Sequence, residues 1–143
     1  EERLYSEFAD RVTALTQCHE QMEFRKAAAE LRAIWVAGNE YLQVAAPWTA
    51  IKTDRDAAAV GVRTGLNAAA LFAILAQPFI PDAAAAVLDA LGVPQMKRSW
   101  PKPGDRGVWN LLAPGHRFSP PDLLFKKIED TDVAAWAERF GGA

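Results

Sequence analysis

Apolar residues recur at spacings of three and four over the first 45 positions, and this spacing restricts that part of the chain to helices. The first series is Leu4, Phe8, Val12, Leu15, Cys18 and Met22, and the second is Phe24, Ala28, Leu31, Trp35, Gly38, Leu42 and Ala45. Such spacing places each series on one face of an α-helix. The first helix is expected over about 4–19. The second must end before Pro47, because proline cannot continue a helix and disfavours helical geometry at the preceding residue.

Two more helices are indicated by the residues at their ends. Asp54 or Asp56 can cap a third helix, which Pro78 terminates. Pro81 begins a fourth, and Gly92 ends it. The predicted apolar faces are Val60, Leu66, Ala69, Phe72 and Leu75 on the third helix and Ala84, Val87, Leu88 and Leu91 on the fourth.

The chain changes character in its last third. Residues 95–122 are rich in proline and glycine and are predicted to be a connector, mostly loop, with one turn near 108–112. The apolar run Leu123–Ile128 follows, and a last helix is expected from Thr131 or Asp132. Its apolar side holds Val133, Trp136, Ala137 and Phe140. No strand pattern competes, so we predict one all-α domain over 1–143, a bundle of four to five helices.

Composition narrows the class of protein without choosing the function. A chain of 143 residues, half of them apolar, is the size of one domain that can bury a core. The net charge of -2 neither argues for a nucleic-acid partner nor excludes a local basic patch. Cys18 is the single cysteine, so an internal disulfide framework is excluded and a reducing, cytoplasmic location is expected.

The sequence also lacks the marks of secretion or membrane insertion. No window approaches the roughly 20 continuous apolar residues of a membrane span, so no membrane partner is expected. The chain starts at Glu1 without an initiator methionine, and we expect it to be part of a longer protein.

Trp48 is the first candidate for a functional residue. It follows Pro47 just beyond the end of the second helix, where its flat ring can stack on an unpaired base. Lys52 and Arg55 lie within a few residues and could contact phosphates. Local chemistry alone leaves a second interpretation open, in which the tryptophan simply closes the end of the bundle.

The segment Asn39-x-Tyr41-x5-Pro47-Trp48-x3-Lys52 resembles the end of the second helix in the anticodon-binding domain of methionyl-tRNA synthetases. Further matching pieces follow the order expected in that family. They are Phe24-x2-Ala27, Leu71 through Pro78-Phe79-Ile80-Pro81, Leu91-Gly92, Pro114-Gly115-His116 and Leu124-Phe125-Lys126-Lys127-Ile128-Glu129. Together they cover the chain from about Leu4 to Phe140, which makes the resemblance specific.

This resemblance implies a function. The family's full protein joins methionine to its tRNA with ATP, in a separate catalytic domain, and its helical domain reads the CAU anticodon. The family's stacking tryptophan corresponds to Trp48 and the preceding proline to Pro47. ATP and methionine would bind the catalytic domain, so no cofactor is expected here. In the family the C-terminal end folds back toward the catalytic half, so residues 123–143 are expected to dock on that domain. The other interpretation, left open here, is that these residues complete the bundle.

Other functional features of the family are absent from this chain. Two further anticodon-reading residues, an asparagine and an arginine four positions apart, lie on an earlier helix, and the chain is expected to begin after it. Asn39 is therefore not that asparagine, and Gln43 stands four positions on. The catalytic signatures are missing, and one cysteine with two histidines cannot form a zinc knuckle. We therefore expect no catalytic residue and no metal.

Two rival hypotheses use other parts of the chain. A free-standing RNA-binding protein could use the basic and aromatic side chains of the connector, which are Lys97, Arg98, Trp100, Lys102, Arg106 and Trp109. The favoured interpretation of this stretch is a solvated loop that its two tryptophans pin to the bundle. An alanine-rich bundle could instead be a protein-interaction module without RNA affinity. His116 is interpreted as a structural hydrogen-bonding residue. His19 suits the end of the first helix, and Cys18 is interpreted as a small core residue.

Overall fold

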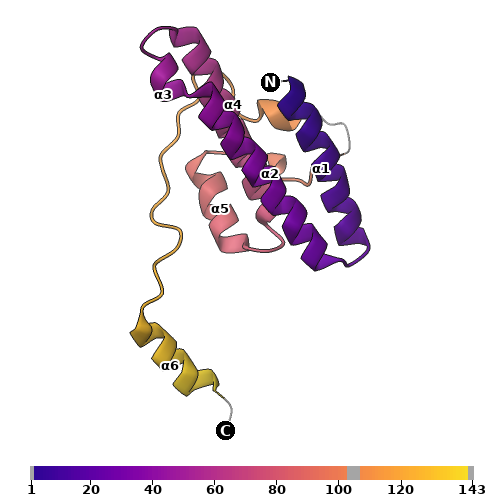
Figure 1. The fold of residues 1–143 in the computed structure, drawn as a ribbon, viewed down its shortest axis with the longest axis vertical. Helices are drawn as coiled ribbons and strands as arrows, with labels where there is room; N and C mark the ends of the chain where they lie inside the picture. Colours follow the sequence, from indigo (N-terminus) through magenta and orange to yellow (C-terminus); the bar gives the residue numbers. More distant parts are fainter. Residues whose placement is uncertain (1, 103–106, 142–143) are drawn as a thin grey trace.

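A computed structural model of the chain describes residues 2–102 and 107–141, which form helices joined by loops. The helices are α1 (Glu2–Glu20), α2 (Phe24–Ala45), α3 (Pro47–Ala50), α4 (Arg55–Ala76), α5 (Pro81–Ala90) and α6 (Asp130–Phe140), with short 3-10 helices η1 (Gln95–Lys97) and η2 (Gly107–Asn110). Among the described residues there is no strand, and the all-α prediction is confirmed (Figure 1).

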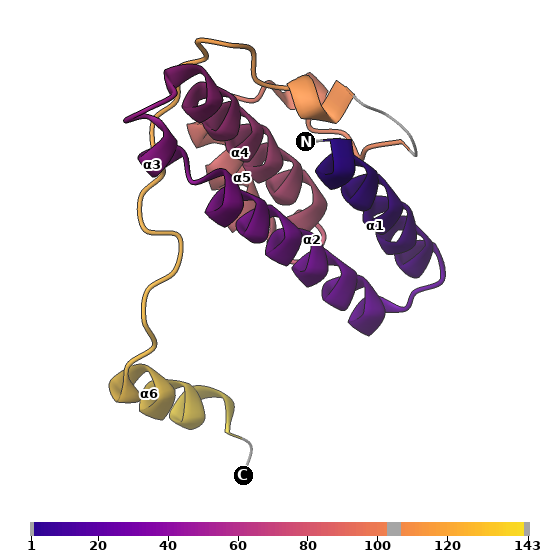
Figure 2. The same cartoon turned by 45° about the horizontal axis from the view of Figure 1, so that its top comes forward.

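Helix α4 is the centre of the bundle. It contacts α2, α3, α5 and η2, while α1 and α2 lie side by side (Figures 1 and 2). By length and composition Arg55–Ala76 could cross a membrane, but 56% of its apolar stretch is buried inside the structure. A helix with neighbours on several sides needs apolar residues almost all round. The high hydropathy of α4 is therefore accounted for by its position in the core.

The buried face of α2 differs from the predicted one by about one position. Phe24 is 56% exposed and Trp35 37%, and Ala28 is also exposed. Leu31 and Gly38 are buried as predicted, and the other buried residues of α2 are Ala27, Ile34 and Ala37. The prediction was wrong there because α2 packs on both α1 and α4, so its buried stripe is centred between the two contacts. Gly38 lies so close to the Phe72 ring that a side-chain carbon would collide with it.

Two further residues of the predicted faces are exposed. Met22 is 77% exposed because it follows the end of α1, in a left-handed turn with φ +57°. Val60 is 48% exposed, since it borders an open groove at the start of α4. The face predicted for α1 otherwise holds, with Leu4, Phe8, Val12 and Leu15 buried.

The connector 95–122 supplies part of the core. Trp109, on η2, is 8% exposed and stacks on Phe8 with ring centroids 5.0 Å apart. Leu112 is tied to α4 by Asn67, whose side chain accepts from the Leu112 N–H at 2.9 Å and donates to its carbonyl at 3.2 Å. A buried amide that satisfies both backbone groups avoids the desolvation penalty of leaving them unpaired. Further along, the Ser119 N–H donates to the Ala90 carbonyl at 3.1 Å. The connector is therefore fixed to the bundle as far as Ser119.

Helix α6 stands apart from the bundle at the end of an extended segment (Figures 1 and 2). It begins at Asp130 after the cap residue Glu129, slightly before the predicted start. Glu129 and Asp132 form a reciprocal capping box. The hydrogen bond from Lys126, aided by the Glu129 backbone N–H, lowers the pKa of Asp132. The helix therefore has its own start signal, although no residue in it is buried.

Candidate functional site

The junction between α2 and α3 has a specific backbone geometry. Ala46 adopts the left-handed conformation, with φ 37° and ψ 57°, and its N–H donates to the Leu42 carbonyl at 2.9 Å. This is the C-terminal cap that helices commonly use before a change of direction. Pro47 then occupies the first turn of α3, where the missing N–H costs nothing. The chain therefore turns sharply at Ala46, immediately before Trp48.

Pro47 and Trp48 have opposite environments. Pro47 is buried beside Gly61 of α4, at which a side-chain carbon would lie 3.6 Å from the Pro47 Cβ. Trp48 is 55% exposed. The proline therefore anchors the turn, while the large aromatic ring faces solvent. An exposed tryptophan on an anchored turn can stack without first being ordered, which lowers the entropic cost of binding.

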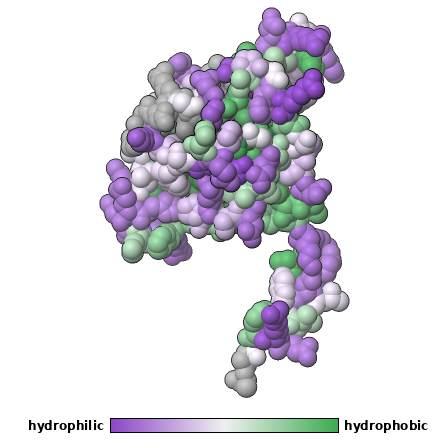
Figure 3. All heavy atoms as spheres, turned by 180° about the vertical axis from the view of Figure 1, so that it is seen from behind, coloured by the Kyte–Doolittle hydropathy of each residue, from purple (hydrophilic) through white to green (hydrophobic). Residues whose placement is uncertain are grey.

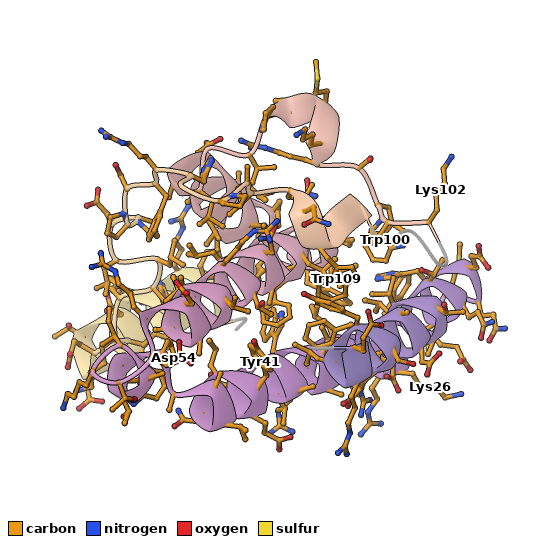
Figure 4. The ribbon with its side chains drawn as sticks, turned by 90° about the horizontal axis from the view of Figure 1, so that it is seen from above. Lys26, Tyr41, Asp54, Trp100, Lys102 and Trp109 are labelled. Carbon is orange, nitrogen blue, oxygen red and sulfur yellow. The ribbon has the colours of Figure 1, made fainter. Side chains whose placement is uncertain are left out.

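The turn between α3 and α4 carries the two predicted phosphate contacts. Lys52 and Arg55 are both exposed, and neither forms an ion pair with another described residue. Asp54 caps α4 by accepting the Ala57 N–H at 2.9 Å, as predicted for one of the two aspartates. Figure 4 shows Asp54 far from Lys102, toward the opposite end of the bundle. All four predicted site residues thus lie within one short stretch from α3 to the start of α4.

Both tryptophans of the rival basic and aromatic loop contact the bundle. Trp100 donates its indole N–H to the Thr16 hydroxyl at 2.8 Å, and Trp109 is in the core. Figure 4 shows Trp109 pointing into the bundle, whereas Lys102 points away from it. Arg98 is held by Asp89 at 2.6 Å. Arg106 lies outside the described residues. The tryptophans needed for stacking are thus used to pin the loop to the bundle.

The remaining polar candidates have structural surroundings. The Nε2 atom of His116 forms a 2.6 Å hydrogen bond with the Leu91 carbonyl, as expected for a structural residue. His19 lies among aromatic rings, with its centroid 5.3 Å from that of Trp100 and 5.4 Å from that of Phe79, and its Nε2 atom is buried without a hydrogen-bond partner. Cys18 is partly buried against the core. No group of three potential metal ligands is gathered within the described part of the chain.

Sequence reasoning missed a groove next to the predicted site. It has a volume of about 510 Å³ and lies between α3, the first half of α4 and residues 112–116. Pro47 and Arg55 are among its lining residues, so it borders the surface that carries Trp48. Its walls come from segments far apart in the chain, and no local pattern could reveal it. Only the folded chain brings them together.

Comparison with known proteins identifies the family. The model of the anticodon binding domain of methionyl tRNA ligase matches residues 1–143. The methionine–tRNA ligases of Maricaulis maris, Hyphomonas neptunium and Caulobacter vibrioides are 60%, 55% and 52% identical to this chain over 139, 141 and 143 residues. Those alignments cover 96%, 96% and 100% of the chain but only 24%, 24% and 25% of the relatives, so the chain spans about a quarter of their length. The helical bundle, its exposed tryptophan turn and these matches together show that the chain belongs to the family of anticodon-binding domains of methionyl-tRNA ligases.

Proposed function

We propose that this domain recognises the CAU anticodon of tRNA(Met) by stacking an unpaired anticodon base on Trp48. The observation that carries the proposal is the 55% exposed indole ring on a turn anchored by buried Pro47. Base–aromatic stacking contributes about 1–3 kcal/mol per base. Membership of the anticodon-binding family supports the choice of RNA as the ligand.

Lys52 and Arg55 contribute phosphate contacts in this proposal. Both side chains are exposed in the same short stretch as Trp48, from α3 to the start of α4. The RNA backbone on either side of the stacked base would pass close to them. Contacts to phosphate position an RNA and carry no sequence information directly. These two residues therefore supply affinity and salt dependence, and the preference for CAU comes from contacts with the bases.

The whole protein would be a cytoplasmic ligase that attaches methionine to tRNA(Met) using ATP. Its curated relatives are methionine–tRNA ligases about four times as long as this chain. ATP and methionine would bind in a catalytic domain outside the chain described here. The role of this domain is to select the tRNA, and its own residues carry no step of the reaction.

The direct test measures the anisotropy of a labelled anticodon stem-loop mixed with the full-length protein. The CAU loop is compared with a loop in which only the first anticodon base is changed. We expect the CAU loop to bind about 5- to 150-fold more tightly, the effect of a single lost base contact of about 1–3 kcal/mol. Equal binding of both loops, or binding of neither, would reject anticodon recognition and favour a protein-interaction module.

We further propose that the C-terminal segment docks on the catalytic domain of the same protein. Val133, Trp136 and Phe140 form an apolar side of α6 and are 53%, 45% and 70% exposed, and in the preceding run Leu123 is 85% exposed. Figure 3 shows apolar and polar side chains next to one another on this part of the molecule. Val133, Trp136 and Phe140 are spaced by three and four residues and so share one face of the helix, and exposed apolar side chains grouped in this way favour an interaction site.

Replacing both Trp136 and Phe140 with alanine should release this segment in the full-length protein. Each side chain contributes about 1.5–3 kcal/mol when it is buried, so the docked state loses about 3–6 kcal/mol. Limited proteolysis should then cut within residues 117–129 much faster than in the unchanged protein. Glu138→Ala on the same helix is the matched control. Equal cleavage of the double variant and the control would contradict docking.

A further inference from the structure

We propose that the groove beside Trp48 is a second base-binding site, which receives another unpaired nucleobase of the same RNA loop. The inference rests on the proposed function and extends it from one stacked base to two bases bound on neighbouring surfaces. The groove is bounded by α3, α4 and residues 112–116, and its volume of about 510 Å³ is ample for a nucleobase.

The lining of the groove suits the flat face of a base. Its lining includes Ala59, Val62 and Leu66 of α4, together with Pro47 of α3 and Pro114 of the connector. These are small or rigid apolar groups, which contact a ring without losing much side-chain entropy. Bases that are splayed out of an RNA loop are typically held against such surfaces.

Two arginines at the groove give it the charge that a nucleotide requires. Arg55 is exposed and forms no ion pair with another described residue. Arg63 is fixed in place, because its Nη2 atom donates to the Asn110 side chain at 2.7 Å and its Nε atom lies 3.5 Å from the Leu112 carbonyl. One exposed arginine and one held by hydrogen bonds, beside an apolar surface, match a nucleotide, which has a flat base and a negatively charged phosphate.

Continuity with the Trp48 surface identifies the occupant. Pro47 and Arg55 belong both to the groove and to the predicted RNA-binding residues. An RNA loop that stacks on Trp48 and contacts Arg55 therefore passes over the mouth of the groove. An apolar side chain from elsewhere in the full-length protein could fill the apolar part of the groove, but it would not pair with the Arg55 guanidinium.

The test combines a groove-filling substitution with single abasic nucleotides in the anticodon stem-loop, using the full-length protein. Ala59→Phe fills the groove from an exposed position in its lining, and Ala85→Phe, an exposed alanine on α5, is the matched control. We expect Ala59→Phe to weaken stem-loop binding on the order of tenfold. We expect Ala85→Phe to leave it unchanged.

The abasic scan distinguishes this inference from the proposed function. In the unchanged protein, removing the base at either of two loop positions should weaken stem-loop binding. In Trp48→Ala, removal of the first base should no longer matter, and in Ala59→Phe only removal of the second base should no longer matter. If Trp48→Ala removes one sensitivity but Ala59→Phe removes none, the second site is rejected and anticodon stacking is retained. If Ala59→Phe lowers the melting temperature without changing Kd, the groove is filled by protein and the inference is also rejected.

Discussion

Replacing Trp48 with alanine in the full-length protein should weaken its binding to the CAU stem-loop by roughly ten- to a hundredfold. The ring is 55% exposed, so the substitution removes a stacking surface and leaves the core unchanged. Loss of one base–aromatic stack costs about 1–3 kcal/mol, and every 1.4 kcal/mol is a factor of ten in affinity. Fluorescence anisotropy at fixed ionic strength measures the change directly.

Two further variants separate stacking from a general loss of structure. Trp48→Phe keeps an aromatic face and should recover much of the affinity. Trp35→Ala removes another partly exposed tryptophan, 37% exposed on α2, and should leave the affinity unchanged. If Trp48→Ala binds the CAU loop as tightly as Trp35→Ala does, Trp48 does not stack on the RNA.

Replacing Phe8 with alanine should destabilise the bundle by about 3–5 kcal/mol, the usual cost of emptying a buried phenylalanine site. Phe8 has no exposed surface, and it joins three segments of the fold. Its ring stacks on Trp109 at 5.0 Å and meets the edge of Phe72 at 5.7 Å. Its removal therefore leaves a cavity between α1, α4 and η2 that rigid aromatic neighbours cannot close.

Hydrogen exchange in the full-length protein is the appropriate measurement, because it reports the stability of this domain separately from the others. Backbone amides of α1 and α4 should exchange roughly two to three orders of magnitude faster in Phe8→Ala. Phe24→Ala removes the same side chain from a 56% exposed position and should change the exchange of these helices little. Similar exchange in the two variants would show that the Phe8 cluster does not hold the bundle together.

The helices could be predicted from the sequence more reliably than the direction in which they face. Helix ends are local events, because Pro47, Asp54 and Gly92 act through their own backbone or side-chain chemistry. Which face of a helix is buried depends on the helices packed against it, and the local sequence does not specify them. Trp35 fits an apolar stripe along α2, yet the contacts with α1 and α4 leave it partly exposed and bury Ile34 instead.

For the candidate site, too, the local features could be predicted from the sequence and the contacts between distant segments could not. Trp48 could be singled out because its position after Pro47 and the family resemblance both depend on residues close together in the chain. The burial of Pro47 next to an exposed Trp48 could not be predicted, because Pro47 packs against Gly61 of another helix. In the connector, the sequence favoured tryptophans that pin the loop to the bundle, and the fold supplies their partners on α1, which are Thr16 for Trp100 and Phe8 for Trp109.

The hydrogen bonds that tie the connector to the end of α5 also limit how far α6 can travel. His116 contacts the Leu91 carbonyl, and the Ser119 N–H donates to the Ala90 carbonyl at 3.1 Å. Only the stretch from Ser119 to the cap residue Glu129 lies beyond these anchors, and about 10 residues span at most roughly 35 Å when fully extended. This stretch acts as a tether of known maximum length. Any surface on which α6 docks must lie within that radius of Ser119, which restricts the possible placements of the rest of the protein around the bundle.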